Sequence, residues 1–125
     1  MLKVHTQKLG EVTILHLRGR ITISETEVLL NAVGMQFDAA VVVLDLARVS
    51  GIDAYGLGVL LELRERTRSK GIEFTLMNAT RLVRQVFEIT CLNKVFEFSS
   101  EVEVLLKASR DRPVTVIESF HKRVW

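Results

Sequence analysis

The spacing of apolar residues changes several times along the chain, and each change marks a predicted element. Short runs rich in β-branched residues at 2–6 and 12–18 flank Gly10, a spacing that favours a two-residue turn, so they predict an antiparallel hairpin. In that register His5 lies opposite His16. Two facing imidazoles are too few for a zinc site and nothing nearby completes the set, so we expect no metal there.

A helix is predicted to follow the hairpin, because Ser24 and Glu27 have the spacing of an N-terminal capping box. Apolar residues then recur at helical spacing and form its expected buried stripe, which consists of Val28, Leu29, Ala32 and Val33. The run 41–46 is almost entirely apolar and does not alternate with polar positions. Such a run predicts a strand that is covered on both faces, as in a parallel sheet.

Strands and helices continue to alternate beyond this point. Gly71 favours the left-handed conformation that ends helices, so we expect a helix to stop just before it. Strands that alternate with helices after an antiparallel opening indicate an α/β domain. We expect a mixed sheet of about five strands and about four helices. The predicted helices after the run 41–46 cover 54–70, 79–90 and 100–109, and the predicted strands cover 72–77 and 95–98.

The last segment, 110–125, departs from this rhythm, so we expect one domain over 1–109 followed by a basic C-terminal tail. Residues 114–117 have the composition of an edge strand, and a disordered tail is the alternative. Residues 107–125 carry five basic and two acidic side chains, whereas the rest of the chain carries 12 basic and 13 acidic ones. The near-neutral body lacks the basic face that nucleic-acid binding needs, so no nucleic-acid partner is predicted.

Composition places the chain among ordinary globular domains, since 48% of its 125 residues are hydrophobic and 26% are charged. No apolar run approaches the roughly 18 residues that a membrane span requires, so no direct membrane insertion is predicted. The single cysteine, Cys91, can form no internal disulfide and lies beside an apolar stripe. We expect it to be a small buried hydrophobe in a cytoplasmic protein.

Glycine patterns raise the question of nucleotide binding. Gly56 and Gly58 have the spacing that opens a dinucleotide fingerprint, but its third glycine would fall on Leu61. Gly51 and Gly56 have the spacing of a phosphate loop, but Leu57 stands where that loop needs a lysine. No nucleophile elbow or metalloprotease motif is present either. The sequence therefore predicts a non-catalytic protein that uses no cofactor.

The segment 41–61, VVVLDLARVSGIDAYGLGVLL, closely resembles the signature of STAS domains, the sulfate transporter and anti-sigma factor antagonist family. The flanking frame matches as well, with LRGRI at 17–21 and GIEFTL at 71–76, so the resemblance covers residues 1 to about 109. It implies an STAS-like fold and a small partner-binding module. Such a module is typically a bacterial regulator that binds a serine kinase acting as an anti-sigma factor and so frees a sigma factor.

In that family a serine directly after the motif aspartate is phosphorylated by the kinase, and phosphorylation abolishes binding. Here the aspartate is Asp53 and the serine is replaced by Ala54. Asp53 is placed to cap the following helix by accepting from the amide of Tyr55 or Gly56. The positive end of that helix would favour a phosphate, but alanine can never carry one. We therefore predict a module that is always competent to bind.

The resemblance implies that an anti-sigma factor or serine kinase, or another regulatory protein, binds through two neighbouring loops. The predicted partner-binding residues are Arg20, Ile21, Thr22, Ile23, Gly51, Ile52, Asp53, Ala54, Tyr55, Gly56 and Leu57. Among them Tyr55 is either an exposed aromatic anchor for the partner or a ring that lies on its own scaffold. Ser50 and Thr22 stay open as alternative phosphoacceptors.

A second function class stays open beside partner switching. The domain could be a non-switching scaffold, such as an accessory subunit of a lipid or anion transporter or a part of a stress-sensing complex. These are other uses to which STAS domains are put, and the fold alone does not decide between them. A homodimer is also compatible with the sequence.

Overall fold

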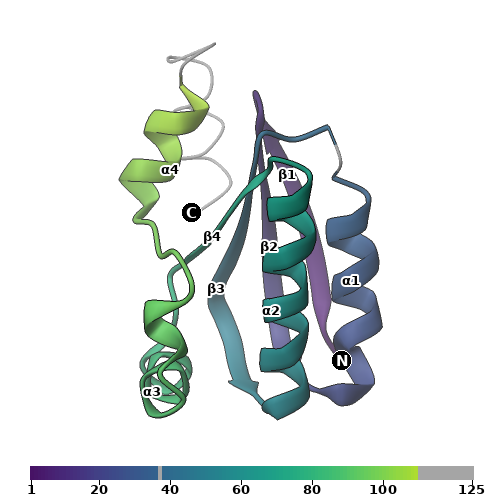
Figure 1. Cartoon of the computed structure of the whole chain (residues 1–125), viewed down its shortest axis with the longest axis vertical. Helices are drawn as coiled ribbons and strands as arrows, with labels where there is room; N and C mark the ends of the chain where they lie inside the picture. The colour runs from purple at the N-terminus through teal and green to yellow at the C-terminus, as the bar shows by residue number, and fades with distance from the viewer. Residues whose placement is uncertain (37, 110–125) are drawn as a thin grey trace.

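The computed structural model describes residues 1–36 and 38–109, in which a four-stranded sheet is packed between helices (Figure 1). The strands run in the order β1-β2-β3-β4, with β1 antiparallel to β2 and the two other pairs parallel. The strands are β1 (Lys3–Leu9), β2 (Val12–Ile21), β3 (Val41–Ile52) and β4 (Glu73–Met77). The helices are α1 (Thr26–Gly34), α2 (Ala54–Ser69), α3 (Arg81–Ile89) and α4 (Glu101–Ala108), with short 3₁₀ turns η1 (Ile23–Glu25) and η2 (Leu92–Lys94).

The predicted N-terminal hairpin is confirmed. Leu9 pairs with Val12 across the turn, and Gly10 takes a positive φ of 61°, which suits glycine at this position. His5 faces His16 in the resulting register, as expected. The hairpin therefore delivers both imidazoles to neighbouring positions of one sheet face.

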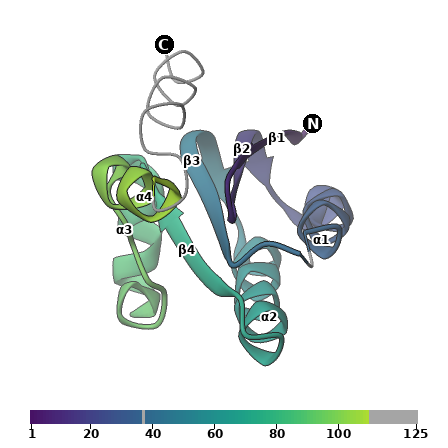
Figure 2. The same ribbon diagram turned by 90° about the horizontal axis from the view of Figure 1, so that it is seen from above.

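Two apolar clusters hold the sheet, one on each face. The larger cluster joins α1, α2 and α3 to one face, and its fully buried members include Leu29, Leu60 and Phe87. The smaller cluster joins α4 to the opposite face through Val104 and Ala108. Seen from above, α4 and α2 lie on opposite sides of the strands (Figure 2). The first halves of β2 and β3 are thus covered on both faces, which confirms the prediction made from the apolar run 41–46 for its own strand.

The sheet has four strands in the described part of the chain, one fewer than the sequence analysis predicted. The segment predicted as the fifth strand contributes a single parallel bridge, between Phe98 and Leu76. Its start is tied to the preceding η2 turn, because the amides of Val95 and Phe96 both donate to the carbonyl of Leu92, at 3.0 and 3.2 Å. These turn bonds compete with pairing to β4, so only the end of the segment reaches the sheet.

Two further local predictions are wrong. Ser24 and Glu27 form no capping box: η1 occupies this stretch, and α1 begins at Thr26 without a side-chain cap. Cys91 is exposed rather than buried, because it follows the end of α3 in a left-handed conformation with a φ of 60°. The predictions for the tail 110–125 lie outside the described residues. None of the helices in the described ranges is both long and apolar enough to cross a membrane.

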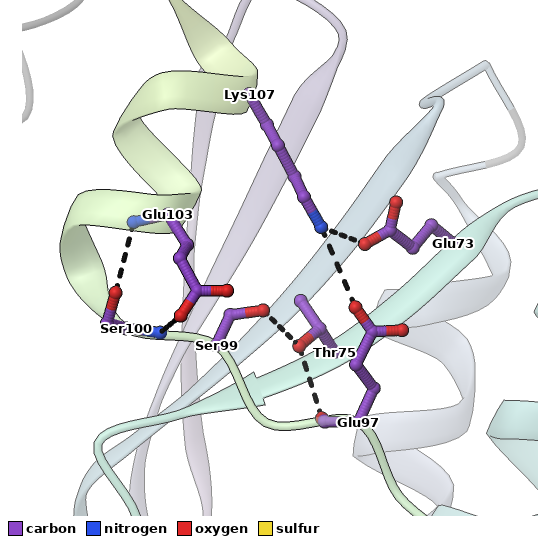
Figure 3. Close-up of polar contacts among 7 residues, drawn as sticks. All are labelled: Glu73, Thr75, Glu97, Ser99, Ser100, Glu103 and Lys107. Atoms are coloured by element: carbon purple, nitrogen blue, oxygen red, sulfur yellow. Dashed lines mark hydrogen bonds and ion pairs between the residues drawn. The ribbon is translucent and has the colours of Figure 1, made fainter.

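Polar contacts fix α4 against the edge of the sheet (Figure 3). A capping box begins the helix: the Ser100 hydroxyl accepts from the Glu103 amide at 3.1 Å, and the Glu103 carboxylate accepts from the Ser100 amide at 3.2 Å. At the other end of the helix, the Lys107 ammonium donates to Glu73 on β4 and lies 3.7 Å from Glu97. The capping box therefore fixes where the helix begins, and the ion-pair cluster ties its other end to the sheet edge.

Candidate functional site

The residues singled out by the sequence meet where β2 and β3 end and α2 begins. Strand pairing places Arg20 beside Gly51 and Ile21 beside Ile52, so the two predicted loops are adjacent in space. Asp53 then joins them. One of its carboxylate oxygens accepts from the Gly56 amide at 2.8 Å and caps α2, as predicted, while the other accepts from the Ile23 amide at 3.2 Å.

Backbone packing at this junction explains the glycine after Tyr55. A Cβ atom on Gly56 would lie 2.2 Å from the carbonyl oxygen of Ile21, which is far inside contact distance. Only glycine therefore allows the first turn of α2 to approach β2 this closely. The same approach brings the start of α2 beside the chain that leaves β2.

Burial divides the predicted partner-binding residues into two groups. Ile21, Gly51, Gly56 and Leu57 are buried, so they shape the loops without being accessible to a partner. Thr22, Ile52 and Asp53 are half-buried. The exposed members, which we call the α2 entry surface, are Arg20, Ile23, Ala54 and Tyr55.

Two large apolar side chains stand out on the α2 entry surface. Tyr55 is 64% exposed and Ile23 is 57% exposed. Ala54, the first residue of α2, is exposed beside Tyr55. The N-terminal end of a helix carries a partial positive charge, so Ala54 lies in a position that favours an anion.

The neighbouring hydroxyls differ in their setting. Ser50 is exposed and its hydroxyl donates to the Gly19 carbonyl at 3.4 Å. Thr22 is half-buried, with its hydroxyl 3.5 Å from that of Ser24. Ser50 lies near the end of β3 and Thr22 directly follows β2, and neither is on α2.

Comparison with known proteins identifies the family. The model of the STAS domain matches residues 3–105 of this chain. The chain belongs to the STAS domain family. Its fold matches that of an anti-sigma factor antagonist from Mycobacterium paratuberculosis, with a TM-score of 0.75 and 20% identity over 86% of this chain and 94% of that one.

Two structures of SpoIIAA have the same fold as this STAS domain. The anti-sigma factor antagonist SpoIIAA in its unphosphorylated form matches with a TM-score of 0.68 and 17% identity, covering 91% of this chain and 98% of that one. The Bacillus cell fate determinant SpoIIAA in its phosphorylated form matches with a TM-score of 0.64 and 16% identity, covering 84% and 98%. The resemblance stated from the sequence is thereby confirmed for family and fold. The roles of individual site residues stay predictions.

A second polar cluster of this STAS domain, centred on Asp45, was not singled out by the sequence analysis. His16 Nδ1 lies 2.7 Å from one oxygen of Asp45, and His16 Nε2 lies 2.8 Å from the amide oxygen of Gln7. The other Asp45 oxygen accepts from the Ala47 amide at 3.0 Å and from Asn78 at 3.1 Å. The available signal was one acidic residue inside the otherwise apolar run 41–46.

Electrostatics at Asp45 follow from these contacts. Burial by itself would raise the pKa of Asp45, but hydrogen bonds from His16, the Ala47 amide and Asn78, with the charge of His16, lower that pKa below its ordinary value. The Asp45 carboxylate is therefore held ionised. The rings of His5 and His16 stack with centroids 6.0 Å apart. Across residues 1–36 and 38–109, no three histidine, cysteine or acidic side chains are grouped so that they could hold a metal ion.

Proposed function

We propose that this STAS domain is a non-catalytic regulator of the anti-anti-sigma type, which binds an anti-sigma factor or serine kinase through the α2 entry surface. We further propose that it is always competent to bind, because Ala54 can accept no phosphoryl group. The observation that supports this most is the exposure of Ala54 at the first position of α2, directly after the Asp53 cap.

The physical argument concerns charge at the start of a helix. A phosphoserine at the first helical position would carry a charge of about −1.5 to −2 that the helix end stabilises. The same charge in the centre of a protein interface is costly to desolvate and repels acidic partner groups. Alanine keeps the small, uncharged shape of the unmodified serine. Binding would then be regulated by the amount of partner or by another site.

The apolar part of the surface supports a protein partner. Tyr55 and Ile23 are large and exposed; Tyr55 follows the small Ala54 in the chain, and the Ile23 amide is bonded to Asp53 just before it. In this arrangement an aromatic anchor can enter a partner pocket. Asp53 hydrogen-bonds both loops, so the surface is preorganised and loses little conformational entropy on binding. Arg20 adds one cation at its rim.

Affinity purification from the native cell, followed by mass spectrometry, identifies the partner. We expect an anti-sigma factor or serine kinase. Calorimetry with that partner should then show that Ala54→Asp weakens binding by about tenfold or more, since a charge is placed in the interface. Gln85→Glu adds a negative charge on the exposed side of α3 and serves as the matched control, which should bind like the wild type.

The phosphorylation part has its own readout. With a partner kinase and ATP, the wild type should keep its mass, and Ala54→Ser should gain one phosphoryl group. Wild-type affinity in Ala54→Asp, or a phosphorylated Ser50 or Thr22 that abolishes binding, would contradict the proposal. Purification of a transporter ATPase instead would favour the accessory-subunit alternative.

A further inference from the structure

Three cationic side chains form a row across the sheet, on the face that carries α4. In the strand register Lys3 of β1 pairs with Arg18 of β2, and Arg18 pairs in turn with Arg48 of β3. All three are exposed. Like charges that face each other on neighbouring strands destabilise a sheet, so such a row is an unfavourable arrangement in the free protein.

No acidic side chain in the described ranges neutralises the row through an ion pair. The two nearest carboxylates are committed elsewhere. Asp45 accepts hydrogen bonds from His16, Ala47 and Asn78, and Asn78 also donates to Glu101 at 3.0 Å. None of these bonds goes to Lys3, Arg18 or Arg48, so the N–H donors of the row are left to solvent or to a ligand.

The row lines a groove of about 840 Å³. Its wall continues with His5, His16 and Asn78, and two carboxylates, Asp45 and Glu101, also line it, so the three cations of the row outnumber the acidic groups by one. Helix α4 packs on this face through an apolar cluster that includes Ile14 and Val43 of the sheet. The groove starts beyond this cluster. A hollow of this size falls within the range of small-molecule sites, which is roughly 300–1,000 Å³.

We propose that this groove binds a small oxyanion of charge −2 or more, of the phosphate-ester or polyphosphate class. Two guanidinium groups can each grip an oxyanion with paired N–H donors, and the Lys3 ammonium adds a point charge beside them. A bound anion would offset the electrostatic repulsion among the three cations. The free energy that this repulsion costs in the free protein would therefore add to the binding affinity. Asn78 and His16 are hydrogen-bonded to Asp45, so they form a fixed polar wall that the rest of the ligand can contact.

This site is separate from the α2 entry surface, and the two share no residue. Its charge selects against other ligands. Nucleic acid would need a longer basic track than three residues on an otherwise near-neutral body. A concave site of this size also suits a compact ligand better than it suits the flat surface of a protein partner.

The test uses inorganic pyrophosphate as the probe and the full chain as the protein. In a titration followed by amide NMR, shifts should be confined to residues around Lys3, Arg18 and Arg48 and should saturate. Sodium chloride at equal ionic strength should not reproduce them. At saturation the thermal midpoint should rise by roughly 4 °C or more, as expected for a ligand that binds only the folded state.

Two variants distinguish specific binding at the row from nonspecific attraction of the anion to the protein's positive charge. Arg18→Gln removes the middle of the row and should weaken pyrophosphate binding by about tenfold. Arg84→Gln removes an exposed cation from α3 and should leave the affinity unchanged. Without the anion, Arg18→Gln should unfold at the wild-type temperature or above it, since repulsion is relieved.

Three outcomes would overturn the proposal. One is a titration with no saturable shifts at the row, and another is equal weakening by Arg18→Gln and Arg84→Gln. The third is binding of an acidic peptide, such as oligoglutamate, at the row when pyrophosphate does not bind, which would assign the surface to a protein partner. Failure of the Ala54 experiments leaves this test unaffected, since Ala54 takes no part in it.

Discussion

At the scale of single residues, Asp53 illustrates what the sequence can and cannot predict. An aspartate directly before an amphipathic helix is a strong capping signal, and a bond to the amide of Tyr55 or Gly56 was predicted; the structure has the bond to Gly56. Its second bond, to the Ile23 amide 30 residues earlier in the chain, could not be predicted, because it depends on how β2 and β3 pair. The same holds for Asp45, whose partners are His16 on β2, Ala47 further along β3 and Asn78 just after β4.

Asp45 carries the first prediction. Replacing it with Asn removes charge-assisted hydrogen bonds in a partly buried cluster, which should cost about 1.5–3 kcal/mol of stability at pH 7. The pKa of Asp45 is lowered on folding from its ordinary value of 3.8. The ionised carboxylate therefore stabilises the fold fully at pH values above 3.8. This contribution is lost as the pH falls from there through the lowered folded pKa.

Urea unfolding at a series of pH values from 7 to 2.5 measures this contribution. The wild type should lose stability in the acid window, and Asp45→Asn should lose less there, because its own contribution is already absent. Asp38→Asn, which changes an exposed carboxyl, serves as the control and should follow the wild type. Equal acid losses in wild type and Asp45→Asn would contradict the role assigned to the cluster.

At the scale of elements, two pairs with capping-box spacing, Ser24 with Glu27 and Ser100 with Glu103, have different outcomes. Ser100 and Glu103 form the box, whereas Ser24 and Glu27 do not. The difference is tertiary. The Asp53 carboxylate accepts from the Ile23 amide, so a helical turn already begins at Ile23 and the stretch containing Ser24 becomes η1. Local spacing predicts that a helix starts nearby but not which residue caps it.

Serine-to-alanine substitutions at the two positions form a matched pair. Ser100→Ala should cost about 1 kcal/mol, because a cap hydrogen bond is lost. Ser24→Ala should stay within about 0.5 kcal/mol of the wild type, as exposed substitutions away from special features usually do. Urea unfolding at pH 7 gives both values. Equal costs would mean that the Ser24 hydroxyl caps a helix in solution after all.

At the scale of the whole molecule, alternation of strands and helices predicted the α/β class, and the motif 41–61 predicted the STAS fold. Apolar periodicity predicted a buried stripe on the first helix, and Leu29 and Val33 of α1 are buried. It also placed Val28 in that stripe, although Val28 is 42% exposed. Periodicity predicts which face of a helix is buried. How many residues at the edge of that face are buried depends on the elements that pack on it, and these are distant in sequence.

The attachment of α4 to the rest of the molecule carries the last prediction. Lys107 lies between Glu73 and Glu97, and removing it with Lys107→Met leaves two carboxylates facing each other. Burial, together with the charge of Glu73 and a hydrogen bond with it, already raises the pKa of Glu97 above its ordinary value of 4.5, and Lys107 partly offsets that rise. A raised pKa means that the folded protein is more stable when Glu97 is protonated. The stability gained from the protonated Glu97 is lost as the pH rises through its pKa in the folded protein.

The loss in Lys107→Met should therefore depend on pH. At pH 7 we expect about 0.5–1 kcal/mol, because the cluster is partly exposed and screened by solvent. At pH 4 the loss should be smaller, since the raised pKa of Glu97 means that this carboxyl is protonated more readily. Urea unfolding at both pH values measures this, and hydrogen exchange should report faster opening of α4 at pH 7. Lys94→Met, in the exposed η2 turn, is the control for removing a lysine. A loss that is equal at pH 4 and pH 7 would show that Lys107 supports α4 through its alkyl chain rather than through its charge.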